Sequence, residues 1–343
     1  MYGGKIGWRS ERIFPDNPYG DGLVLVRSGE VSRNPKDIEK AVRGWTPFSS
    51  DLVGEGGGRL LPPVCNMATS ALARQSYLRR YGIAVSAWLL GAGFVSVAAF
   101  FRGHGFLVPE LAVLLALYFI VDYTILRGEN ALADRARFLY WIKHDVAVRK
   151  VFIFASLASL LMGGGEWLLV QRYGSAVGAI ERYGLVFTRA LGGEWWRFFV
   201  GPYLHAGFFH YISNVSMFAP ILAVCWRLCG GWSLWVFLIV NLMAPIVSMI
   251  WVIDLFDAYA GISGGVFSLL GLLFGRVVVG RDFFPRGLSV NILSFTAIAL
   301  VASNFSNENS LMISHVIGFI LGWVGVLPIY GRVRGNGWRS DLK

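Results

Sequence analysis

The sequence places one serine, Ser263, between small residues in the stretch 261–265, and an apolar run follows at once. A serine hydroxyl in an apolar helix most often bonds a carbonyl one turn earlier or helps two helices pack closely. A second interpretation arises because four more polar side chains lie in other apolar segments. They are His205, His210, Asn214 and His315. An alcohol, imidazoles and an amide are the groups that acyl transfer requires.

Each of these groups has a role if the reaction is acyl transfer. Ser263 would be the nucleophile, and His315 would be the general base and then the acid for the leaving amine. The backbone N–H of Ser263 and the side chains of His210 and Asn214 would donate hydrogen bonds to the oxyanion. No acidic residue stands at an obvious spacing to orient His315, so the sequence predicts a Ser–His dyad rather than a triad.

The glycines around these residues predict close packing. Gly261, Gly264 and Gly265 let a neighbouring backbone approach the serine, and Gly318 and Gly322 follow His315 by one and two helical turns. The stretch 261–265 also fits the G-x-S-x-G pattern of α/β-hydrolases. That fold requires a strand before the serine and a soluble helix after it. Here a short polar segment precedes the serine and a membrane-length segment follows, so this alternative is disfavoured.

The composition indicates a membrane protein. Of 343 residues, 55% are hydrophobic and only 15% are charged, and the mean hydropathy is +0.55. Soluble domains carry about 25% charged residues. The net charge of +10 is concentrated in certain loops, so it indicates topology and contact with the lipid bilayer rather than nucleic acid. Three cysteines provide no disulfide framework.

Eight apolar segments are each candidates to cross the roughly 30 Å hydrocarbon core as a helix. The sequence therefore predicts an all-α polytopic membrane protein. It divides into a polar basic region (1–80), a transmembrane hairpin (81–126), a charged connector (127–150), a six-helix core (151–330) and a basic tail (331–343). The eight segments lie at about 81–101, 106–126, 151–171, 203–228, 232–253, 259–279, 288–303 and 311–330.

The distribution of Lys and Arg predicts the orientation. Basic residues collect in the connector 127–150, around Arg227, around Arg276–Arg286 and in the tail, whereas the connections at 254–258 and 304–310 have none. The positive-inside rule then places both termini in the cytoplasm, and we expect the inner membrane of a bacterium. The arginines of the long outer loop, 172–202, are an exception to this distribution. They are spread through a long loop, so the basic residues of the other connections decide the predicted orientation.

This topology brings the polar residues to a similar depth. Ser263 and His315 each come about four residues after the outer start of a segment, which is roughly 6 Å below the outer surface at 1.5 Å per residue. His210 and Asn214 lie one turn apart on a third helix and share a face. Several convergent polar groups are costly in lipid, so a functional site becomes the favoured interpretation.

These residues resemble the motifs of the rhomboid intramembrane serine proteases, over a little more than half of the chain. That family carries a Trp-Arg pair in a long first loop, H-x-x-x-x-H-x-x-x-N, G-x-S-G in the fourth core helix and A-H-x-x-G-x-x-x-G in the sixth. The matching positions here are Trp196-Arg197, His205, His210 and Asn214, Gly261 to Gly264, and His315, Gly318 and Gly322. The resemblance implies a six-helix core at 151–330, and the apolar segments add the two-helix hairpin that precedes it.

The resemblance also implies cleavage of transmembrane protein substrates near their outer ends, without cofactor or metal. It gives His205 a structural part and places Phe267 where many bacterial members stack a tyrosine on the catalytic histidine. Ser314 replaces the usual alanine before His315. A catalytically silent relative that binds transmembrane helices is an alternative, but such relatives typically lack the dyad. A transporter is a weaker alternative, since no inverted repeat is present.

Two further features of the core segments are Glu166 and the short segment 288–303. Glu166 is an acid inside an apolar segment, and no role follows for it. The segment 288–303 is the shortest and least charged of the core, so it is the candidate for a lateral gate through which a substrate enters.

Overall fold

The structure is a computed structural model, and it divides the chain into two compact units. Unit 1 comprises Met1–Asp145, Gly280–Asn291 and Arg332–Lys343, and unit 2 comprises Val146–Val279 and Ile292–Gly331. The residues that it describes are 6–10, 23–27, 30–32, 78–87, 89–91, 93–94, 107–128, 131–252, 257–280, 284–306 and 312–329.

Unit 1 contains a small sheet that the sequence analysis did not predict. Three antiparallel strands are connected in the order β1 (Ile6–Ser10), β2 (Leu23–Arg27) and β3 (Glu30–Ser32). Their register pairs Ile6 with Arg27 and Arg27 with Glu30. The remaining residues of the predicted region 1–80, up to residue 77, lie outside the described part of the chain.

Unit 1 also contains the helices α4 (Leu107–Leu126) and α5 (Ala131–His144). Asp122 is buried, accepts a hydrogen bond from the Tyr81 hydroxyl at 2.7 Å and pairs with the Arg135 guanidinium at 2.7 Å. Tyr81 lies in the helical residues 78–87, so this bond joins the two parts of the predicted hairpin. These two partners satisfy the carboxylate inside the protein, as a buried charge requires.

The core helices agree with the predicted segments. They are α6 (Val146–Tyr173), α10 (Phe208–Cys229), α11 (Trp232–Val252), α12 (Ser263–Val279), α13 (Leu288–Ser306) and α14 (Met312–Val324). Among the described residues, four helices are long and apolar enough to span a membrane, and three shorter apolar helices accompany them. Large apolar side chains such as Leu160 and Leu161 on α6 are exposed, as lipid-facing residues are. The all-α polytopic membrane fold is confirmed.

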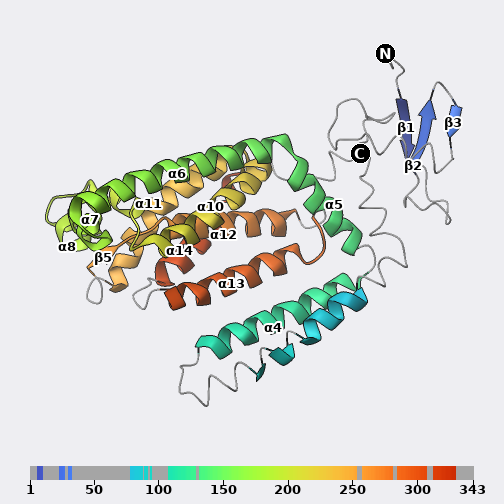
Figure 1. Cartoon of the computed structure of the whole chain (residues 1–343). Coiled ribbons are helices and arrows are strands. Elements are labelled where there is room, and N and C mark those ends of the chain that lie inside the picture. Colours follow the sequence, from blue (N-terminus) through green and yellow to red (C-terminus); the bar gives the residue numbers. More distant parts are fainter. Residues whose placement is uncertain are drawn as a thin grey trace. The chain divides into compact units, whose positions relative to one another are not determined.

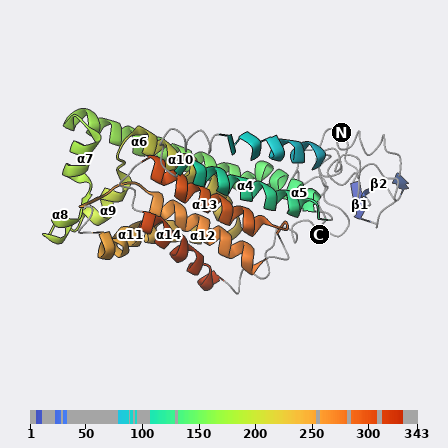
Figure 2. The same cartoon turned by 90° about the horizontal axis from the view of Figure 1, so that it is seen from below.

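Helix α12 lies at the centre of unit 2. It packs against α14, α11 and α10, and α6 packs on the outside of α10 (Figures 1 and 2). Every residue of α12 from Ser263 to Leu272 is buried. Within the described part of the chain, the extensively packed helix pairs do not include α13.

Small residues explain why α12 and α14 pack so closely. A Cβ atom added to Gly318 would collide with the carbonyl oxygen of Gly264, and one added to Gly322 would collide with that of Ser268. Because both neighbours are backbone atoms, they cannot move aside as a flexible side chain would. The helices therefore meet backbone to backbone, and this contact depends on glycine.

Two details of the predicted segments were wrong. Helix α12 begins at Ser263 itself rather than four residues earlier, because Gly261 has a φ of +101° that no helix accommodates. Arg276 lies inside α12 with 0% exposure rather than in a basic connection, and its Nε contacts the carbonyl oxygen of Leu228 at 3.5 Å.

The predicted long loop, 172–202, is mostly structured. It contains α7 (Ala176–Tyr183), β4 (Leu185–Val186), α8 (Phe187–Leu191) and α9 (Arg197–Val200), and η1 (Gly201–Tyr203) connects it to α10. The Ser175 hydroxyl caps the start of α7 by accepting a hydrogen bond from the Gly178 N–H at 3.0 Å. Strand β4 pairs antiparallel with β5 (Ala258–Tyr259), just before Ser263.

Candidate active site

Ser263 and His315 form a hydrogen-bonded pair between two helices. The Ser263 Oγ lies 2.8 Å from the His315 Nε2, and each residue is 6% exposed. Ser263 is the first residue of α12 and His315 is the fourth residue of α14. The close packing of these helices brings the alcohol within proton-transfer distance of an imidazole, which is the geometry that activates a serine nucleophile.

A phenylalanine fixes the plane of the histidine ring. Phe267 lies one turn after Ser263 on α12, and its ring stacks on the His315 ring with centroids 4.6 Å apart and an interplanar angle of 11°. The serine and the stacking ring therefore come from the same face of one helix. Together they hold the imidazole from its edge and from its flat side.

A glycine turn brings the oxyanion candidates close to the start of α12. A Cβ atom on Gly261 would lie 2.8 Å from the His210 Nε2 and 3.2 Å from the Asn214 Nδ2. Only glycine leaves room for these two side chains beside the chain that leads into Ser263. The Asn214 Nδ2 also donates to the His210 carbonyl oxygen at 3.1 Å, which orients the amide along α10 and leaves its second N–H for another acceptor.

His205 is held by Glu166, the acid that sequence analysis left unplaced. The Glu166 Oε1 accepts a hydrogen bond from the His205 backbone N–H at 2.8 Å, and its Oε2 lies 3.0 Å from the His205 Nδ1. Both residues are buried. The carboxylate therefore fastens the segment before α10 to α6, and it satisfies a backbone donor that the turn leaves free.

The segment before α10, which contains Leu204 and His205, contacts both His210 and the turn at Gly261. The His205 ring packs edge-on against the His210 ring, with centroids 5.3 Å apart. The neighbouring Leu204 carbonyl oxygen accepts the Gly261 N–H at 2.6 Å. Glu166 thus fixes a residue pair that touches both an oxyanion candidate and the turn before the serine.

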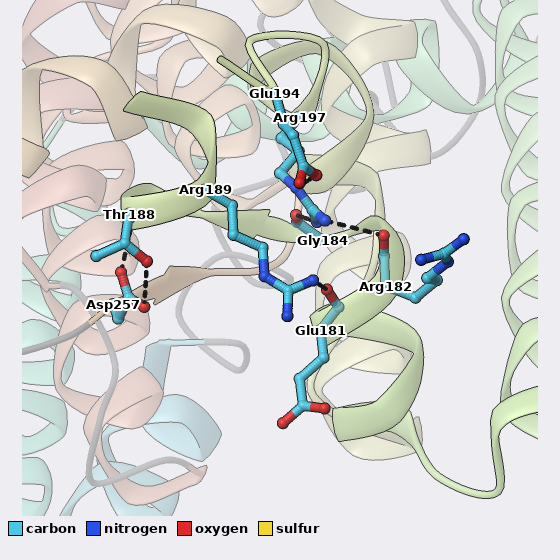
Figure 3. Close-up of polar contacts among 8 residues, drawn as sticks. All are labelled: Glu181, Arg182, Gly184, Thr188, Arg189, Glu194, Arg197 and Asp257. Atoms are coloured by element: carbon cyan, nitrogen blue, oxygen red, sulfur yellow. Dashed lines mark hydrogen bonds and ion pairs between the residues drawn. The ribbon is translucent and has the colours of Figure 1, made fainter. Parts of the chain in front are cut away.

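The Trp196–Arg197 pair organises the long loop rather than contacting the dyad. Arg197 is 1% exposed. Its guanidinium donates to the carbonyl oxygens of Gly184 at 2.6 Å and Arg182 at 3.1 Å, and its Nε donates to the Glu194 carboxylate at 2.7 Å (Figure 3). The guanidinium carbon lies 4.7 Å from the Trp196 ring centroid. A buried charge with these partners stabilises the turn that leads into β4.

The loop is joined in turn to the segment before the serine. The Asp257 carboxylate accepts hydrogen bonds from the Thr188 N–H at 2.9 Å and the Thr188 hydroxyl at 2.8 Å (Figure 3). Strand β5 follows, and Tyr259 pairs with Leu185 of β4. Burial raises the pKa of the Tyr259 phenol, so it stays neutral. Arg197 is therefore linked to the segment before Ser263 through β4 and β5.

The structure thus brings together Ser263, His315, Phe267, Gly261, His210 and Asn214, and it places Gly264, Gly318 and Gly322 at the helix contact behind them. His205 lies beside this group, and Trp196 and Arg197 lie in the supporting loop. Glu166 stands out in the sequence as an acid in an apolar segment, but its partner, His205, lies 39 residues away on an irregular turn. No spacing rule predicts such a contact.

The comparisons with known proteins agree with the motifs. Residues 192–332 match the Rhomboid domain. The chain is similar to the putative rhomboid protease YdcA of Bacillus subtilis (strain 168), with 32% identity over 138 residues. It is also similar to the rhomboid protease GluP of the same organism, with 30% identity over 138 residues.

The similarity covers part of each protein. The aligned residues make up 38% of this chain in both cases, and they span 66% of YdcA and 25% of GluP. The matched domain begins in the loop before Trp196 and contains every residue of the site except Glu166. With its apolar spanning helices and this domain, the chain is an integral membrane protein of the rhomboid family.

Proposed function

We propose that this protein is an intramembrane serine endopeptidase that cleaves transmembrane segments of other membrane proteins. The observation that carries the proposal is the 2.8 Å contact between the Ser263 Oγ and the His315 Nε2 at buried positions of two packed helices. A buried alcohol and imidazole in this geometry are the nucleophile and base of nucleophilic catalysis. The protease names of the two relatives support the same reaction.

In the first half of the proposed reaction, the Ser263 Oγ attacks the carbonyl carbon of the scissile peptide while the His315 Nε2 takes its proton. The tetrahedral intermediate then collapses, and His315 gives the proton to the leaving amine. This leaves an acyl ester on Ser263. In the second half, His315 takes a proton from water, the resulting hydroxide attacks the ester, and the serine regains its proton as the acid product leaves.

The oxyanion candidates lie where the negative charge develops. The first N–H groups of α12 have no partners within the helix, and the helix dipole makes this end positive. The Ser263 N–H is therefore a donor beside the reacting carbon. The side chains of His210 and Asn214, which approach Gly261, supply the other donors of the proposed oxyanion hole.

The distribution of basic residues supports an orientation with both termini in the cytoplasm and the start of α12 towards the outside, in the inner membrane of a bacterium. The scissile bond of a substrate would then lie near the outer end of its transmembrane segment. Reconstitution of the purified protein in liposomes with a model transmembrane substrate tests this proposal. Mass spectrometry of the products should place the cut in the outer third of the segment. No cleavage, or a cut outside the membrane segment, would contradict it.

Asn214→Ala tests the proposed oxyanion hole. We expect kcat to fall roughly 10²–10³-fold, because one donor to the developing charge is lost, while KM stays nearly constant since the donor acts only in the transition state. The measurement is the kinetics of transmembrane substrate cleavage, with thermal unfolding as a control for fold. An unchanged kcat would exclude Asn214 from the hole, and complete loss of cleavage would assign it another task.

A further inference from the structure

The proposed mechanism uses one nitrogen of His315 and leaves the other to be explained. For the Ser263 hydroxyl to be activated, it must donate its proton to the Nε2, 2.8 Å away. The Nε2 must therefore carry a lone pair. In a neutral imidazole the ring proton then sits on the Nδ1. An imidazole held in the opposite tautomer presents an N–H to the serine and cannot act as its base.

The structure places a hydroxyl at this second nitrogen. The Ser303 Oγ of α13 lies 3.4 Å from the His315 Nδ1. The same Oγ donates its proton to the Leu300 carbonyl oxygen at 2.7 Å. A hydroxyl has one proton to give and two lone pairs. Because the proton is directed to Leu300, the oxygen faces His315 as an acceptor.

Stacking alone does not select this tautomer. The Phe267 ring lies flat against the His315 ring, at 4.6 Å and 11°, and this contact with the ring face is the same whichever nitrogen carries the proton. A hydrogen bond at one nitrogen distinguishes the two tautomers. Ser303 is the described partner at the edge opposite Ser263.

We propose that Ser303 is a positioning residue of the active site, which holds His315 with its Nδ1 protonated and its Nε2 free to accept the Ser263 proton. This rests on the proposed protease function. The hydrogen bonds form a chain from Ser263 through His315 and Ser303 to the Leu300 carbonyl. The 3.4 Å contact is long for a hydrogen bond, and such contacts in a free enzyme shorten when substrate binds.

The position of Ser303 gives this bond a second consequence. Ser303 lies on α13, which, for the residues that the structure describes, is not one of the extensively packed helices of unit 2. Any displacement of α13 changes the distance between its hydroxyl and His315. The hydrogen bond therefore couples the placement of α13 to the readiness of the catalytic base.

Ser303→Ala, Ser303→Thr and a control variant test the proposal. We expect Ser303→Ala to lower kcat about tenfold, as the loss of one hydrogen bond inside a protein does, with KM within about twofold of wild type. The rate at which a fluorophosphonate labels Ser263 should fall equally, because that reaction needs the base but no substrate. Ser303→Thr keeps the hydroxyl and should recover kcat to within about threefold.

Thr296→Val is the matched control. Thr296 is buried on the same helix, and its hydroxyl donates to the Ile292 carbonyl oxygen at 2.8 Å, as that of Ser303 does to Leu300. We expect wild-type kinetics from this variant. An equal loss in Thr296→Val and Ser303→Ala would show that the effect comes from helix packing and would overturn the proposal.

Two further results would also overturn it. One is Ser303→Ala with wild-type labelling and cleavage rates, and the other is Ser303→Thr as impaired as Ser303→Ala. If Ser303→Ala fails to fold, ¹⁵N NMR of histidine-labelled wild-type protein decides instead, since the proposal requires a neutral His315 with a protonated Nδ1. Wild-type protein that labels at Ser263 upholds the protease function in each of these cases, so the two proposals fail separately.

Discussion

Ser263→Ala is expected to reduce cleavage of a transmembrane substrate to the uncatalysed background, while the protein still inserts and folds. The change removes the attacking oxygen and nothing else, since the Cβ remains in place. In serine proteases such a deletion costs on the order of 10⁶-fold in kcat. His315 would keep its stacking contact with Phe267, so the fold has little reason to change. Cleavage in proteoliposomes measures the loss, and thermal unfolding checks the fold.

A second buried serine provides the control for this variant. The Ser248 hydroxyl on α11 donates to the Pro245 carbonyl oxygen at 3.1 Å, and the residue is 0% exposed. Ser248→Ala therefore also removes a buried hydroxyl, but one whose hydrogen bond lies within α11 and not in the dyad, and it should leave cleavage within about threefold of wild type. Undiminished cleavage by Ser263→Ala would rule out the proposed mechanism.

Gly322→Ala is expected to have the second largest effect, although the residue touches no reacting atom. Its new Cβ would overlap the carbonyl oxygen of Ser268 on α12. Because that oxygen belongs to the backbone, α12 and α14 must separate to admit the methyl group. The two helices carry Ser263 and His315, and a displacement of about 1 Å in a catalytic group costs on the order of 10²-fold in rate.

The same substitution on another membrane helix isolates this effect. Gly164 lies on α6, and a Cβ atom there would have nothing within 4 Å. Gly164→Ala should therefore retain wild-type cleavage. For Gly322→Ala we expect kcat to fall about 10²-fold or more, together with a lower unfolding temperature. Equal activity of the two glycine variants would show that the α12–α14 contact does not set the distance between serine and histidine.

The sequence predicted the reacting residues because membrane helices restrict where polar groups occur. An alcohol at 263 and an imidazole at 315 stand out in apolar segments, and helix rise alone gives their depth. The structure puts them in contact. The sequence did not predict that α12 starts at Ser263, since hydropathy does not register the positive φ of Gly261.

The supporting residues were harder to predict, for a different reason. Glu166 was visible as an intramembrane acid, but His205 meets it through an irregular turn whose path no periodicity describes. Ser303 gave no signal at all, because a serine in an apolar helix most often bonds its own backbone. The sequence analysis assigned Arg276 to a connection, because cations inside membrane helices are rare. The structure instead leaves this arginine 0% exposed within α12.

The most direct test of the central claim is covalent labelling of the intact protein in a membrane with an activity-based fluorophosphonate, followed by mass spectrometry of its peptides. The reagent reacts with a serine oxygen that an adjacent base has activated, and fluoride leaves as the adduct forms. We predict one adduct, on Ser263, and none in Ser263→Ala or His315→Ala. Folded wild-type protein that forms no adduct, or forms it on a different serine, would contradict the account.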